Sequence, residues 1–261
     1  MNTVIVPVDF SETSLHAAKY AAQLLVGHYG VTLILYHSYS KAADKASIDQ
    51  DLEDLKTSLM SEHIVKMETL SHLEDDFVEG LETAVRHRNA DLVIMGITGK
   101  SAIAQVLFGS NTLKMAATKA CPVLIVPEDA SFSDIKNVLL TSDFKNTLNS
   151  TPSVPIKNFL KVFNPTLHVI NVDKDHYISL TEEYEKEKQD LKKLFEGFNP
   201  EFYFMRLFEM EEALDLFSKD KNIDLLIAIQ KNHSFMESLF HRSRTKILSY
   251  RSKVPILVVH E

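Results

Sequence analysis

The chain repeats itself once, and this duplication constrains the fold more than any other feature. Four pairs of segments match in the same order, at offsets of 134 or 133 residues: 4–10 with 138–144, 31–35 with 165–169, 91–94 with 224–227, and 122–126 with 255–259. Chance explains such order poorly. We predict two copies of one domain, residues 1–130 and 136–261, joined by a short polar segment.

Each copy alternates short apolar runs with stretches of helical periodicity, the pattern of a parallel sheet covered on both faces. The first copy predicts strands at 3–8, 31–37, 64–70, 92–96 and 123–126, and helices at 14–25, 49–62, 75–88 and 111–119. The second predicts strands at 137–141, 166–172, 201–207, 224–229 and 255–259, and helices at 149–163, 180–196, 209–221 and 239–251. The fold class is therefore α/β, with two tandem, doubly wound, Rossmann-like domains.

Composition narrows the functional classes. The net charge of −8 argues against nucleic acid and against anionic membrane surfaces as partners. No apolar run approaches the ~20 residues of a membrane span, and the first residues do not resemble a signal peptide, so we expect a cytoplasmic protein. The single cysteine, Cys121, rules out an intrachain disulfide and is expected to be a small core residue.

Six of the seven glycines lie in the first copy, and three of them form a spaced cluster. Gly96 and Gly99 follow a predicted strand, and Gly109 opens a predicted helix. Glycine lets a backbone approach a ligand closely, and a helix start favours phosphate, so the pattern indicates an anion cradle. The hydroxyls of Ser110 and Thr112 can add donors there. A plain loop with a helix cap is the alternative reading.

Neighbouring residues have two readings as well. Asp9 ends the first strand, where such sheets bind ligands, but it can equally form a turn before Ser11, the expected helix cap. Lys100 can contact phosphate or lie in solvent. The Gly99-Lys100-Ser101 run is not a P-loop, because that motif needs a glycine where Ile94 stands.

The spacing Gly-x2-Gly-x9-Gly-Ser, the opening Ile5–Glu12 and the closing Cys121–Pro127 together resemble the universal stress protein family. The resemblance implies adenine-nucleotide binding, with ATP, ADP or AMP held across the strand ends, and Mg²⁺ accompanying a triphosphate. It implies that adenine lies near Pro7, Val8, Asp9 and Ser38. It implies that ribose and phosphates lie along Met95, Gly96, Gly99, Lys100, Gly109, Ser110 and Asn111.

The second copy keeps the aspartate, as Asp143, but loses the glycines. Ile229, Asn232 and Arg242 replace Gly96, Gly99 and Gly109. β-Branched Ile229 would disfavour a positive-φ turn. The side chain of Arg242 would occupy the space in which a phosphate approaches the backbone. We therefore expect that the second copy does not bind ATP in the same way. A local basic cluster is either a solvated loop or a docking surface; it comprises Lys231, His233, His241, Arg242 and Arg244.

These observations lead to one hypothesis and two alternatives. The first is an ATP-binding stress-response regulator, with nucleotide only in the N-terminal domain and an unknown protein partner. The alternatives are a weak ATPase or adenylate hydrolase, although no catalytic or metal-binding constellation is recognisable, and a nucleotide-independent interaction module. Pairing of the closing strands, 123–126 with 256–259, would make the chain an internal pseudo-dimer, and whole chains can associate further as a homodimer.

Overall fold

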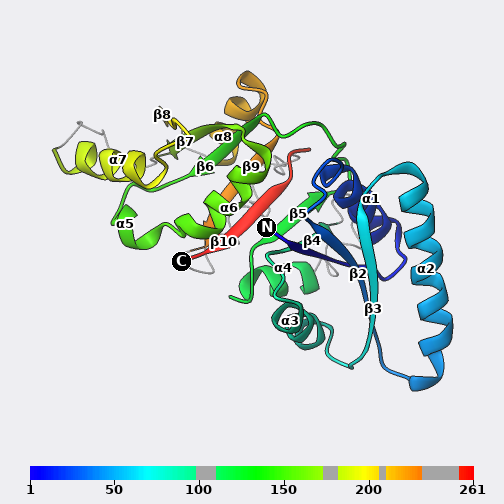
Figure 1. Ribbon diagram of the computed structural model, residues 1–261. Helices are drawn as coiled ribbons and strands as arrows, with labels where there is room; N and C mark the ends of the chain where they lie inside the picture. Colours follow the sequence, from blue (N-terminus) through cyan, green and yellow to red (C-terminus); the bar gives the residue numbers. More distant parts are fainter. Residues whose placement is uncertain (98–109, 173–181, 206–209, 231–252) are drawn as a thin grey trace. The chain divides into compact units, whose positions relative to one another are not determined.

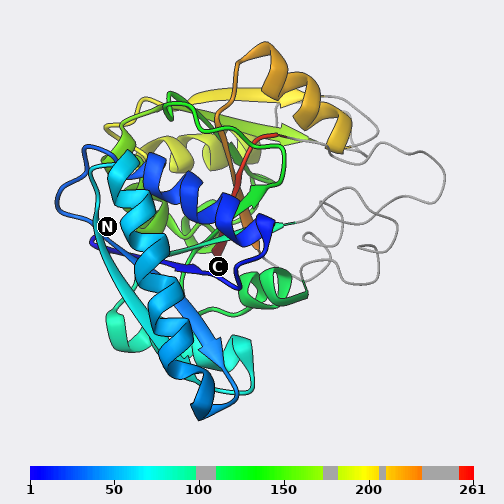
Figure 2. The same cartoon turned by 90° about the vertical axis from the view of Figure 1, so that its right-hand side faces the viewer.

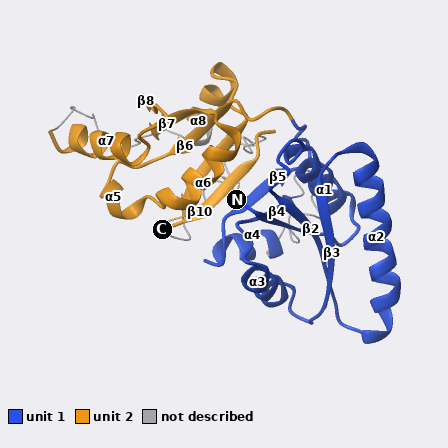
Figure 3. Ribbon diagram, viewed as in Figure 1, with its two compact units in different colours: residues 1–132 blue, residues 133–261 orange. Residues whose placement is uncertain are grey.

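The computed structural model describes residues 1–97, 110–172, 182–205, 210–230 and 253–261. The chain divides into two compact units, Met1–Phe132 and Ser133–Glu261 (Figure 3). The strands described in each unit form a parallel sheet, and helices alternate with them along the chain (Figure 1). The predicted α/β fold class is thereby confirmed.

Unit 1 has the strand order β3-β2-β1-β4-β5. Its elements are β1 (Thr3–Pro7), α1 (Glu12–Leu24), β2 (Thr32–Tyr39), a 3₁₀ turn η1 (Ala42–Asp44), α2 (Lys45–Glu62), β3 (Lys66–Leu73), α3 (Phe77–Arg88), β4 (Leu92–Ile97), α4 (Ser110–Ala117) and β5 (Val123–Pro127). Helices α1 and α2 lie side by side in both views, and Lys19 of α1 pairs with Glu62 of α2 at 3.2 Å (Figures 1 and 2). Helices α3 and α4 contact each other on the opposite face.

Unit 2 repeats this order as β8-β7-β6-β9-β10. Its elements are β6 (Asn137–Thr141), α5 (Thr147–Ser150), α6 (Ser153–Phe163), β7 (Thr166–Val172), α7 (Glu182–Leu194), β8 (Glu201–Met205), α8 (Met210–Asp220), β9 (Leu225–Gln230) and β10 (Ile256–His260). Successive side chains of β8 point to opposite faces of the sheet, and each face is covered by a helix. Phe204 contacts Tyr184 of α7, whereas Tyr203 contacts Phe217 of α8. The helix predicted at 239–251 lies outside the described residues.

The prediction of one helix over 149–163 is wrong. The segment forms α5 and α6, separated at Thr151 and Pro152. Thr151 is extended, with φ −104° and ψ 113°, as expected for a residue that precedes proline. Because Pro152 has no N–H to donate, it serves as the residue before the first turn of α6 rather than as a helix interior position.

The same aspartate clamp ties the start of each sheet. In unit 1 Asp91 Oδ2 accepts hydrogen bonds from the N–H groups of Asn2, at 2.6 Å, and Thr3, at 3.1 Å. In unit 2 Asp224 Oδ2 accepts from Lys136 and Asn137, at 2.8 and 2.9 Å. These carboxylates therefore have a structural task at the amino edge, away from the carboxyl ends of the strands.

The interior agrees with the sequence pattern. Val4, Ile5 and Val6 of β1 are fully buried, as expected for a central parallel strand. Cys121 is buried, and burial raises the pKa of its thiol to about 12, so the expected core role is confirmed. In the described parts of the chain, no helix combines the length and the apolar character needed to cross a bilayer.

Candidate functional site

A tight turn follows β1 and fixes Asp9 at the carboxyl end of that strand. Asp9 Oδ1 accepts hydrogen bonds from the Ser11 N–H, at 3.1 Å, and from the Ser11 hydroxyl, at 2.6 Å. Ser11 also caps α1 by accepting from the Ser14 N–H, as predicted. Phe10 has φ +60°, a left-handed conformation that costs free energy for a bulky residue. The turn reading of Asp9 is thus correct, and it leaves the exposed carboxylate at the strand end.

The surroundings keep Asp9 ionised. Partial burial would raise the pKa of its carboxyl group, but hydrogen bonds from Ser11 and Ser14 outweigh this and hold the pKa below the ordinary value of 3.8. At neutral pH the side chain is a hydrogen-bond acceptor with a negative charge. It suits an amine or hydroxyl donor of a ligand and would repel a phosphate.

The next strand end supplies a residue that sequence reasoning did not select. Pro7 and Val8 are buried, and Ser38 is half-buried at the end of β2. The Val8 N–H donates to the Tyr36 carbonyl at 2.8 Å. His37 Nδ1 lies 2.6 Å from the Val8 carbonyl oxygen, so this nitrogen donates. An isolated histidine in a strand carries no motif, and only its position beside Ser38 could have drawn attention to it.

Gly96 has a packing role in addition to the one predicted for it. It lies within β4, opposite Val126 of β5, in the strand that was predicted at 92–96. A Cβ at this position would come 2.5 Å from the Thr13 carbonyl oxygen at the start of α1. No positive φ is present there. This glycine therefore permits the close approach of α1 to β4, and its backbone does not take a left-handed conformation.

The first turn of α4 is anchored to the same strand. Thr112 is buried, and its hydroxyl donates to the Gly96 carbonyl at 3.0 Å. Thr112 is consequently committed to the fold and does not provide the ligand donor that the sequence suggested. The bond places the beginning of α4, Ser110 and the exposed Asn111, at the carboxyl end of β4.

Part of the predicted site can be located and part cannot. The described members lie at the carboxyl ends of β1, β2 and β4 and at the start of α4: Pro7, Val8, Asp9, Ser38, Met95, Gly96, Ser110 and Asn111. Gly99, Lys100 and Gly109 lie outside the described residues. So do Asn232 and the whole basic cluster, Lys231, His233, His241, Arg242 and Arg244.

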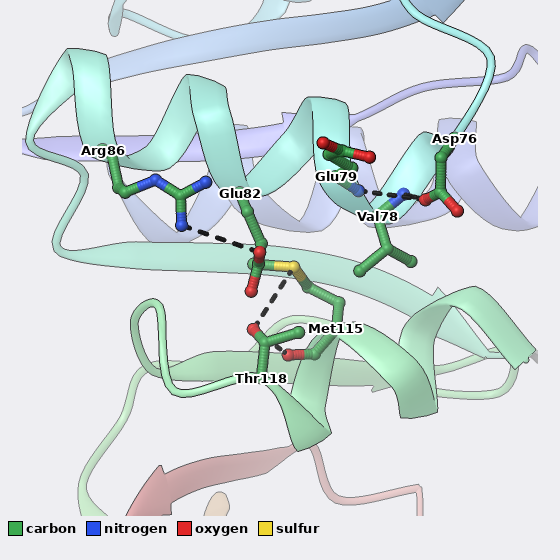
Figure 4. Close-up of polar contacts among 7 residues, drawn as sticks. All are labelled: Asp76, Val78, Glu79, Glu82, Arg86, Met115 and Thr118. Atoms are coloured by element: carbon green, nitrogen blue, oxygen red, sulfur yellow. Dashed lines mark hydrogen bonds and ion pairs between the residues drawn. The ribbon is translucent and has the colours of Figure 1, made fainter.

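A groove lies between α3 and α4 (Figure 4). This groove has a volume of about 610 Å³ and is lined by residues of both helices. Its polar groups mostly serve local structure. Asp76 caps α3, Arg86 pairs with Glu82 at 3.6 Å, and the Thr118 hydroxyl donates to the Met115 carbonyl. The residues predicted to bind nucleotide do not line this groove.

Unit 2 has the same turn after its first strand, at Asp143, but aromatic rings pack beside it. The Lys145 N–H donates to Asp143 Oδ1 at 3.2 Å, and Phe144 has φ +53°. Phe144 is buried and stacks on Tyr184 with 4.9 Å between ring centroids. Phe10, its counterpart in unit 1, is only half-buried. Ile229, which replaces Gly96, is a buried residue of β9.

Comparison with known proteins supports the family resemblance. The sequence profile described as "Universal stress protein family" matches residues 1–127. A universal stress protein of Thermus aquaticus, described by its place in the 3′ region of the QAH/OAS sulfhydrylase, is 28% identical over 134 residues, or 48% of this chain and 97% of that protein. The crystal structure of an Archaeoglobus fulgidus universal stress protein covers 99% of this chain and 96% of its own, with 16% identity and a TM-score of 0.66, which shows a shared fold.

A further structure, a universal stress protein in complex with cAMP, aligns with 49% of this chain and 97% of its own, at 28% identity and a TM-score of 0.41. The profile match falls on the half of the chain that carries the three-glycine pattern. Residues 1–127, a little under half of the chain, therefore form a domain of the universal stress protein family.

Proposed function

We propose that unit 1 binds an adenine nucleotide, with ATP as the first candidate, and that the chain is a stress-response regulator with nucleotide in this domain only. The observation that carries the proposal is the ionised, exposed Asp9, held at the same sheet edge as the first turn of α4. An acceptor for the nucleoside and a helix start for its phosphates are therefore both present at the carboxyl ends of the strands.

Each proposed role follows from chemistry. Asp9 would accept a hydrogen bond from the adenine amine or a ribose hydroxyl. Buried Pro7, Val8 and Met95 would give the base an apolar floor, with Ser38 beside it. The phosphates would lie along Gly96, Gly99, Lys100, Gly109, Ser110 and Asn111. Any Mg²⁺ would accompany the triphosphate and be bound mainly by its oxygens, as is usual for this ion in nucleotide sites.

Restriction to unit 1 rests on the contrast between the two turns. In unit 2 the rings of Phe144 and Tyr184 pack against each other over the turn that carries Asp143. Arg242 replaces the glycine that would let a phosphate reach the start of the last helix. Unit 2 would then contribute stability or a docking surface instead of a second nucleotide.

A regulator must also report its state. We propose that nucleotide binding changes what the segment 100–108 presents to a protein partner, since this segment joins two of the proposed phosphate-binding glycines. The partner must bind the occupied and empty forms with different affinity, because an equal affinity would transmit nothing.

Calorimetric titration of ATP tests the site directly. Gly109→Arg introduces the residue that unit 2 has at this position and should abolish measurable binding. Gly30→Arg is the matched control, because a side chain at Gly30 meets open space. Wild type and the control should bind one ATP per chain with the same affinity. Equal affinity in Gly109→Arg would refute the assigned site.

A further inference from the structure

The β1–β2 ladder ends in an unusual way. The Val8 N–H donates to the Tyr36 carbonyl, as a parallel ladder requires. The next bond of such a ladder would join the Ser38 N–H to the Val8 carbonyl. Instead, the imidazole of His37 donates to that carbonyl, at 2.6 Å. The His37 side chain thus donates to the Val8 carbonyl in place of a backbone N–H. This contact lies at the end of the two strands, where we propose that the base binds.

The same imidazole supports the turn that carries Asp9. Its ring lies 5.5 Å from the Phe10 ring, centroid to centroid, at an angle of 34°. Phe10 occupies the left-handed region, at φ +60°, which needs support from its surroundings. His37 therefore fixes both sides of the turn: the carbonyl of Val8 before Asp9 and the ring of Phe10 after it.

Unit 2 contains the same device with a different side chain. Asn171 stands at the position of His37, and its Nδ2 donates to the Ser142 carbonyl at 3.0 Å. Ser142 corresponds to Val8, and its N–H donates to the Ile170 carbonyl, also at 3.0 Å. Phe144 repeats the left-handed φ of Phe10. What the two copies share is one side-chain N–H donor aimed at one carbonyl, supplied by an imidazole in unit 1 and by an amide in unit 2.

The two copies differ in what surrounds this device. Phe144 in unit 2 is buried against Tyr184. In unit 1 Asp9 is exposed and Ser38 half-buried, so both remain within reach of a ligand. A base entering there could accept a hydrogen bond from the Ser38 N–H and donate one to Asp9.

We propose that His37 is a positioning residue of the nucleotide site. Because His37 donates a hydrogen bond to the Val8 carbonyl, the Ser38 N–H is left to donate to the base. The same hydrogen bond fixes the turn that carries Asp9. The inference rests on the proposed function, because it concerns the base-binding half of that site. It makes no use of histidine charge, since Nδ1–H donates in the neutral and the protonated ring alike.

Two substitutions separate positioning from simple support. His37→Leu removes the donor, and His37→Asn supplies the donor that unit 2 already uses. ATP and inorganic tripolyphosphate are titrated against each variant. We expect His37→Leu to weaken ATP binding by about tenfold, the effect of one or two lost hydrogen bonds, with tripolyphosphate affinity unchanged. His37→Asn should restore ATP affinity to within about twofold of wild type.

The outcomes are distinguishable. If wild type binds ATP and His37→Leu binds it equally well, the positioning role is wrong although the nucleotide site stands. If His37→Leu weakens both ligands equally, or His37→Asn fails to restore ATP binding, His37 has a merely structural role and the inference is again overturned. If wild type binds neither ligand, the proposed function itself fails.

A measurement without ligand tests the geometry. ¹⁵N NMR of the imidazole should show Nδ1 protonated and slowly exchanging in the neutral ring of His37. A neutral ring protonated at Nε2 would contradict the assigned bond.

Discussion

The Thr13 carbonyl oxygen lies 2.5 Å from the point that a Cβ on Gly96 would occupy. Gly96→Ala therefore forces α1 away from β4 and should destabilise unit 1 by about 1–3 kcal/mol, the usual cost of overpacking a core. In hydrogen exchange measured by mass spectrometry, backbone amides in residues 1–97 should lose protection. The protection of amides in unit 2 should not change. Gly30→Ala, in open space, is the control and should stay within about 0.5 kcal/mol of wild type.

The two aspartate clamps should act independently. Asp91→Asn or Asp224→Asn leaves an amide in place of a carboxylate that accepts two backbone N–H groups. Each change should cost about 1–3 kcal/mol. The loss should appear only in the unit that carries the substitution, as faster amide exchange at the start of β1 or of β6. Equal acceleration in both units after either change would contradict this.

Glu187 links α7 to the start of α5 in a pH-dependent way. Its carboxylate accepts hydrogen bonds from the Thr147 N–H, at 2.8 Å, and hydroxyl, at 2.6 Å. These bonds hold the pKa of Glu187 below its ordinary value of 4.5. The stability that they give is present above that value and is lost as pH falls through the lowered pKa.

The test compares Glu187→Gln with wild type by urea unfolding at about pH 7 and about pH 3.5. The variant should be less stable at the higher pH, and the gap should narrow at the lower pH. Glu183→Gln, an exposed position in the first turn of the same helix, is the control. A gap of the same size at both pH values would show that the Glu187 carboxylate charge does not matter.

Cys121 should report the opening of unit 1. Burial and the nearby charge of Asp91 raise the pKa of its thiol to about 12, so the folded protein holds almost no thiolate at pH 8. Iodoacetamide should label Cys121 slowly in native protein and rapidly in urea. Rapid labelling under native conditions would mean that the Cys121 region opens without unfolding of the unit.

The fold was largely predictable because apolar residues recur along the sequence with the spacing of the buried face of each helix or strand. The strand-by-strand duplication and the Ser11 cap follow from local residue types, and the structure confirms them. The break at Thr151–Pro152 was readable in principle from the proline, but apolar spacing on both sides hid it. The tasks of Gly96 and Thr112 were not readable, since both depend on contacts with elements distant in sequence.

The candidate site, too, was predictable from the sequence only in part. The position of Asp9 at the strand end was predictable because a charged residue directly follows a buried strand. The contact of His37 could not be predicted because it is made with a neighbouring strand, through the Val8 carbonyl. The comparison with Asn171 shows why a motif search could not find it: the two copies place different residue types at this position, each donating a hydrogen bond to the equivalent carbonyl.

The number and location of bound nucleotides test the central claim most directly. Native mass spectrometry of the full chain with ATP, followed by photocrosslinking with an azido-adenine analogue and peptide mapping, gives both quantities. We predict one ATP per chain, crosslinked within residues 1–127. Two nucleotides per chain, a crosslink in residues 136–261, or no binding at all would contradict the account.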